Sequence, residues 1–146
     1  MQTAGAVLAG LALVVAGGSL SRQGLADYFQ QRAENKLADD PLQAIREANR
    51  ALRLDSENPD TYYVKAAALA RFNQADPARN TLQQALAKEP DNFVTWTLLG
   101  DLAVRRGRFA EAQRNYQRAL ALNPEDAGLK LLARDPRSAN KAVGTP

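Results

Sequence analysis

The chain has 146 residues and a formal net charge of +3, and 45% of its residues are hydrophobic but only 6% aromatic. It contains no cysteine and no histidine, which excludes thiol nucleophiles, disulfides, serine–histidine–aspartate triads and the usual zinc sites. Its length fits one domain with appendages. Alanine and leucine dominate while β-branched residues are sparse, so we predict an all-α protein. Because most familiar active sites are excluded, we also predict that it is not an enzyme and needs no cofactor.

The first element that the sequence predicts is an apolar helix at the N-terminus. Between Ala4 and Leu20 no residue is charged, and Ser19 is the only polar side chain. A helix of about 20 residues spans about 30 Å, which matches the hydrocarbon core of a bilayer. We therefore predict a single transmembrane anchor over residues 1–22. One side of this helix carries mostly small side chains, so a second transmembrane helix would pack closely against it. The residues on this side are Ala6, Gly10, Leu13 and Gly17.

Two alternatives to a retained anchor stay open. One is a cleaved secretory signal, although such signals usually begin with a positively charged stretch that this chain lacks. The other is that Met1 is not the natural start and that the segment is the last membrane helix of a larger protein. Basic residues follow the apolar run and none precedes it, so the positive-inside rule places the remainder in the cytoplasm. These residues are Arg22, Arg32 and Lys36.

The remainder of the chain repeats itself with a period of 34 residues. At this offset aromatic or large residues fall on one another, small residues fall on small residues, and a proline falls on a proline. The superposed pairs include Tyr62 with Trp96, Ala66 with Gly100, Ala78 with Ala112, Leu82 with Tyr116, and Pro90 with Pro124. A fixed period of this length indicates stacked helix-turn-helix units.

This spacing resembles the tetratricopeptide repeat (TPR) family. The unit over residues 93–126 matches with Trp96, Leu99, Gly100, Ala103, Ala112, Tyr116, Ala119 and Pro124. The unit over residues 59–92 keeps Tyr62, Ala66, Leu69, Ala78, Leu82, Ala85 and Pro90, but has Lys65 where the family prefers leucine. The resemblance implies that Trp96, Gly100 and Ala112 are structural residues at contacts between helices.

A first, degenerate unit begins near Leu25. Its second helix is expected from Pro41 to Leu54, whereas Gln31 and Arg32 occupy the places where the family has leucine and glycine. This first helix would simply continue the membrane segment into the array. The chain is thus divided into an anchor (residues 1–22), a TPR domain of two clear repeats, one degenerate repeat and a closing helix (residues 23–134), and a disordered tail (residues 135–146).

The resemblance also implies a binding site for a partner protein. In this family the first helix of each unit lines a concave groove. The resemblance therefore implies that the groove is lined by residues of two first helices, which are Asp60, Tyr63, Ala67, Ala70 and Arg71 and, one period later, Val94, Thr97, Asp101, Val104 and Arg105. Arg71 and Arg105 would together grip a carboxylate; the alternative is that both are solvated helix ends. Family members that bind chaperone C-termini have lysine and asparagine at the places of Tyr63, Ala67, Thr97 and Asp101, so that partner is not predicted.

A basic face is expected on the second helices. It consists of Arg46, Arg50, Arg114 and Arg118, and it is either solvated or close to anionic headgroups. It lacks interleaved aromatic residues, so a nucleic-acid partner is not predicted.

Together these features predict a membrane-anchored TPR adaptor or accessory subunit of bacterial type that holds a protein partner in its groove. The alternative is the C-terminal TPR appendage of a multi-span envelope polysaccharide polymerase or ligase. Some bacterial members of that group, including those of the O-antigen ligase kind, end in a membrane helix followed by such repeats, and the chain resembles that arrangement.

Overall fold

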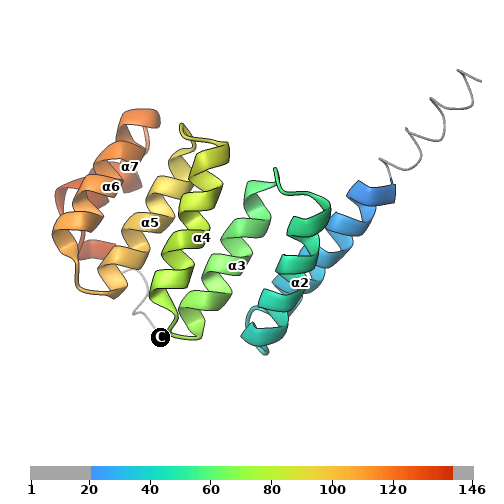
Figure 1. Ribbon diagram of the computed structural model, residues 1–146. Coiled ribbons are helices and arrows are strands. Elements are labelled where there is room, and N and C mark those ends of the chain that lie inside the picture. Colours follow the sequence, from blue (N-terminus) through green and yellow to red (C-terminus); the bar gives the residue numbers. More distant parts are fainter. Residues whose placement is uncertain (1–20, 140–146) are drawn as a thin grey trace, which may run out of the picture.

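The structure, a computed structural model, describes residues 21–139, and within this range all regular elements are helices (Figure 1). Residues 21–36 are helical. They are followed by α2 (Pro41–Leu54), α3 (Pro59–Arg71), α4 (Ala75–Lys88), α5 (Phe93–Arg105), α6 (Phe109–Leu122) and α7 (Ala127–Arg134). The predicted all-α fold is confirmed. Most of the predicted anchor lies outside the described residues, and none of the helices in residues 21–139 combines the length and apolar character that a membrane crossing requires.

The helices stand side by side as successive hairpins (Figure 1). Each of the helices α2 to α7 packs against the next one in the sequence, and α3 also touches α5. The helix of residues 21–36 forms the first hairpin with α2, α3 forms the second with α4, and α5 forms the third with α6. The predicted helix-turn-helix solenoid is therefore present, and α7 closes its C-terminal end.

The ends of the helices are fixed by residues that recur with the repeat. The side chains of Asn58 and Asn92 lie one period apart and accept hydrogen bonds from backbone amides in the first turns of α3 and α5, which caps both helices. Asn73 and Gly107 are also one period apart, and both adopt a left-handed backbone with φ of 57° and 69°. This conformation ends a helix sharply and lets the next one return alongside it.

Two helices approach each other very closely within the third hairpin. A Cβ atom added to Gly100 would lie 2.4 Å from Cε1 of Tyr116, and Tyr116 is completely buried. Ala112 is also completely buried. Trp96 packs against the core between α4 and α5, and its indole Nε1 donates to the carbonyl oxygen of Pro90 over 3.0 Å. These positions agree with the structural role expected for Trp96, Gly100 and Ala112.

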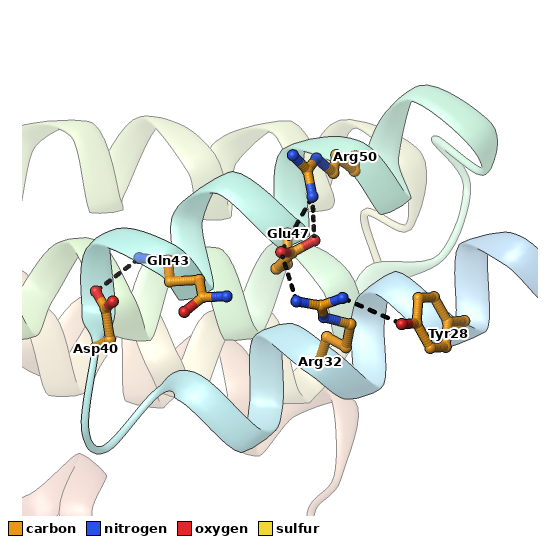
Figure 2. Close-up of polar contacts among 6 residues, drawn as sticks. All are labelled: Tyr28, Arg32, Asp40, Gln43, Glu47 and Arg50. Atoms are coloured by element: carbon orange, nitrogen blue, oxygen red, sulfur yellow. Dashed lines mark hydrogen bonds and ion pairs between the residues drawn. The ribbon is translucent and has the colours of Figure 1, made fainter.

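The first hairpin is held by polar contacts (Figure 2). Glu47 of α2 is only 2% exposed. Its carboxylate accepts hydrogen bonds from Arg50 at 3.0 and 3.1 Å and lies 3.5 Å from the guanidinium of Arg32 on the preceding helix. The helix of residues 21–36 buries Ala26 and Ala33, while Tyr28 stays half exposed. It therefore packs as the first helix of a repeat.

The chain after α7 is partly packed onto the third hairpin. Pro136 is buried, the guanidinium of Arg137 lies 4.6 Å from the centre of the Phe109 ring, and Ala139 packs against the cluster that contains Val104. Residues 135–139, which the sequence analysis assigned to the tail, thus cover part of the domain. Residues 140–146 lie outside the described part of the chain.

Candidate functional site

A pocket of about 230 Å³ opens on the face shared by the first helices of the hairpins. We call it the groove pocket. Its polar residues are Tyr63, Arg71, Asp101 and Arg105, and its apolar lining comes from the turn before α2, from α3, α4 and α5. The apolar residues are Leu37, Ala66, Ala67, Ala70, Ala78, Leu82, Leu98 and Leu102.

The structure brings together six of the ten residues expected to line the groove, namely Tyr63, Ala67, Ala70, Arg71, Asp101 and Arg105. It places the other four, Val104 among them, outside the pocket. Asp60 is exposed near the start of α3, Val94 borders a shallow depression at the start of α5, and the Thr97 hydroxyl donates to the carbonyl oxygen of Phe93 in its own helix. The site is therefore displaced toward the C-terminal ends of α3 and α5.

The expectation that Val104 lines the groove is wrong. Val104 is only 4% exposed and belongs to a buried cluster with Ala133, while Phe109, Leu132 and Ala139 pack around it. The closing helix and the residues after it cover this side chain, so Val104 cannot line the groove.

Most of the apolar lining was not predicted from the sequence. Leu82, Ala66 and Ala78 were identified only as positions of the repeat, and Leu98 and Leu102 were not singled out. Leu37 comes from the turn before α2 and lies one period before Arg71. The repeat spacing that identified Arg71 and Arg105 would have identified Leu37 as well.

A hydrogen bond from the core fixes the carboxylate in the pocket. The buried Tyr116 hydroxyl of α6 donates to Oδ1 of Asp101 over 2.7 Å, and it reaches Asp101 across Gly100, whose missing side chain leaves room for the ring. Burial, together with the hydrogen bond and the charge of Asp101, raises the pKa of the Tyr116 phenol well above its ordinary value. The phenol therefore stays protonated and remains a donor to Asp101.

The two arginines of the pocket have no partner in the part of the chain that the structure describes. Near them Arg79 and Arg108 pair with Glu111, and Arg106 pairs with Asp76. In residues 21–139 neither Arg71 nor Arg105 makes a hydrogen bond or an ion pair, and both side chains are exposed.

Tyr63 forms a rigid wall of the pocket. Its hydroxyl shares a hydrogen bond of 2.8 Å with the Thr95 hydroxyl of α5, and Thr95 is completely buried. Burial raises the pKa of the Tyr63 phenol, and the hydrogen bond with Thr95 partly offsets this effect. The contact joins α3 to α5, so the pocket exists only where two neighbouring repeats are correctly stacked.

Two models of the tetratricopeptide repeat match the chain, over residues 37–102 and 94–126. The chain belongs to the tetratricopeptide repeat family. Among curated TPR proteins it is 31% identical over 113 residues to the small glutamine-rich tetratricopeptide repeat-containing protein 2 of Mycosarcoma maydis, a match that covers 75% of this chain and 32% of that protein. The chain spans less than two fifths of the length of the curated relatives that it matches.

Solved structures share the TPR fold at low sequence identity. The first TPR of Spaghetti (RPAP3), bound to the HSP90 peptide SRMEEVD, superposes with a TM-score of 0.68 at 18% identity and covers 84% of this chain and 96% of that one. The Yersinia enterocolitica type III secretion chaperone SycD, in complex with a peptide of the translocator YopD, gives a TM-score of 0.65 at 16% identity and covers 80% of this chain and 90% of that one.

Proposed function

We propose that this TPR domain is a non-enzymatic adaptor or accessory subunit whose groove pocket binds a segment of a partner protein. The observation that carries the proposal is that Arg71 and Arg105 have no partner among residues 21–139 and lie beside an apolar pocket, although other arginines close by are paired. Free guanidinium groups beside apolar surface suit a ligand with both charged and apolar groups.

Proteins of the same fold support this proposal in general terms. The RPAP3 domain holds an HSP90 peptide, and SycD holds a peptide of YopD. The chain has Tyr63, Ala67, Thr97 and Asp101 where the resemblance expects the lysine and asparagine of chaperone-binding members. We therefore propose a protein segment as the partner, but not a chaperone C-terminus.

We propose further that residues 1–22 anchor the protein in a membrane as a single pass, with the TPR domain in the cytoplasm. The support is the uncharged run from Ala4 to Leu20, followed by basic residues. The same run supports the alternative that the chain is the C-terminal appendage of a multi-span envelope polysaccharide polymerase or ligase. A reading frame that continues upstream of Met1 would favour this alternative.

The proposed binding site is tested by replacing Arg71 and Arg105 together by alanine. Because both side chains are exposed and unpaired in the described structure, helicity and melting temperature should stay nearly unchanged. Binding of the partner captured from detergent-solubilised native membranes should weaken by about 1–3 kcal/mol if each arginine makes a charge-assisted hydrogen bond.

The matched control replaces Arg46 and Arg114 by alanine, since these two exposed arginines on second helices have no partner within residues 21–139. It removes the same charge and should leave binding intact. If the control loses the partner while the Arg71/Arg105 variant keeps it, recognition uses the second helices instead of the groove pocket.

A further inference from the structure

The groove pocket contains opposite charges that do not neutralise each other. Asp101 and Arg105 are four residues apart on α5, a spacing at which an acidic and a basic side chain commonly pair on a helix. In the described part of the chain they form no ion pair. The carboxylate of Asp101 and the guanidinium of Arg105 are held apart, and this affects which ligand the pocket can accept.

The cause is the hydrogen bond from Tyr116. Its hydroxyl holds Oδ1 of Asp101 at 2.7 Å from the side of α6, and the Tyr116 ring cannot move because it is completely buried against Gly100. The Asp101 carboxylate is therefore held in the lining of the pocket instead of swinging along the helix toward Arg105. Its Oδ2 atom has no hydrogen-bond donor among residues 21–139.

The consequence is a pocket whose described lining holds one fixed anion and two unpaired cations. Residues four apart on α5 are separated by about 6 Å along the helix axis. A uniformly acidic segment would suit Arg71 and Arg105 but would bring a like charge to Asp101. A uniformly basic segment would suit Asp101 but would bring like charges to the two arginines. Both mismatches are costly where water is partly excluded.

We infer that the groove pocket selects a partner segment that carries a cationic group for Asp101 and, about one helical turn away, a carboxylate for Arg71 and Arg105. An apolar side chain of the same segment would lie against Leu98 and Leu102, which line the pocket beside these charges. This inference rests on the proposed function and makes Asp101 the residue that determines the sign of the charge at one position of the ligand.

The test uses short random peptides displayed on phage, which are panned against the full-length chain in detergent micelles. Peptides that shift the amide NMR signals of Ala67, Ala70 and Leu102 are scored as pocket ligands. They should combine a lysine or arginine with an aspartate or glutamate. Replacing their basic residue by glutamine should weaken binding to the unaltered protein by about tenfold, as expected for one lost charge-assisted contact.

A double-mutant cycle then assigns the contact to Asp101. Asp101→Asn keeps an oxygen for the Tyr116 hydroxyl but removes the charge, so it should weaken binding of the original peptide by about tenfold and leave binding of the glutamine peptide unchanged. Asp27→Asn is the matched control, because Asp27 is an exposed carboxylate of the first helix outside the pocket, and it should have no effect.

The outcomes separate this inference from the proposed function. Pocket ligands without a preference for a basic residue, or with equal affinity for the Asp101→Asn variant, would overturn the inference and leave a peptide-binding groove in place. A failure of every selected peptide to shift the signals of the pocket amides would overturn both.

Discussion

The contact of Gly100 with Tyr116 shows how the space between the two helices of a hairpin is divided between their side chains. The corresponding pair is Ala66 with Leu82 in the second unit, and both residues lie in the same buried cluster. In the third unit the first helix contributes no side chain and the second contributes a full aromatic ring. A residue at one of these places therefore cannot be enlarged unless its partner is made smaller.

This division predicts the effect of adding one methyl group. Gly100→Ala should lower the free energy of unfolding by on the order of 1–3 kcal/mol, because the new Cβ would lie 2.4 Å from a ring atom of Tyr116 that has no room to retreat. Gly24→Ala is the control, since nothing lies within 4 Å of its added Cβ, and a helical alanine in place of glycine should stabilise by about 0.5–1 kcal/mol. Urea unfolding measures both. Equal effects in the two variants would show that the hairpin contact is wrongly described.

The buried phenol of Tyr116 predicts a change of stability with pH. Because the fold raises its pKa, burial favours the neutral form, and this contribution is complete below the unfolded pKa of about 10. Above that pH the unfolded chain loses the proton first, so stability falls by up to about 1.4 kcal/mol per pH unit. Tyr116→Phe lacks this loss. Its unfolding free energy should therefore decline less steeply than that of the unaltered protein in urea titrations above pH 10, whereas parallel curves would contradict the prediction.

At the scale of elements, the helix of residues 21–36 depends on contacts that the family pattern does not contain. Its Gln30 side-chain oxygen accepts from Asn58 at 2.8 Å and from Thr61 at 3.0 Å, which connects it to the start of α3. Arg32 approaches the buried Glu47. The polar Gln31 and Arg32 at the expected leucine and glycine places hid this packing from sequence analysis, because the signal for a repeat is carried by small and apolar residues.

The contact of Glu47 with Arg32 predicts a local effect on this helix. Glu47→Gln should make the backbone amides of residues 26–36 exchange with solvent about tenfold faster or more, since a buried charge-assisted contact is lost. Amides of α5 and α6 should keep their protection. Glu57→Gln is the control, because it removes an ion pair with Lys88 in which Glu57 is largely exposed and which should contribute little. Unchanged exchange in the Glu47 variant would mean that apolar packing of Ala26 and Ala33 alone holds the helix.

Most of the correct predictions about the helices follow from the period of 34 residues. It gave the helix bounds from Pro41 onward to within a few residues and located Arg71 and Arg105 in one pocket. It did not reveal that Val104 is covered, because the covering residues belong to α7 and the turn after it, which lie outside the repeat. The link between Tyr116 and Asp101 was also missed, since the pattern assigns these residues to a core position and a groove position without relating them.

At the scale of the whole molecule, the TPR units form a linear array in which each helix from α2 to α7 packs against the next one along the chain. The C-terminal end is covered by α7 and residues 135–139. At the other end Leu25 and Tyr28 are 46% and 51% exposed on the first helix, directly after the apolar run of the sequence. The two ends therefore differ in how far their apolar surface is covered.

The proposed anchor predicts how the whole molecule partitions. After carbonate washing at high pH, the full-length chain should remain with the membrane pellet, because its apolar run of about 20 residues is long enough to span the hydrocarbon core. A variant that begins at Ser21 should be released while keeping its helical circular dichroism spectrum. Release of the full-length chain would show that the first residues do not form an anchor.

The position of Trp96 gives the molecule a built-in optical probe. It is the only tryptophan of the sequence, and it lies where the second and third units meet, with its indole bonded to Pro90 and the guanidinium of Arg118 located 5.9 Å from the ring. Its emission therefore reports on that single junction, whereas circular dichroism averages over all helices. If the first hairpin frays before the rest, the two signals will give different midpoints. That difference will measure how weakly the hairpins are coupled, because a state in which only the first hairpin is unfolded is then populated.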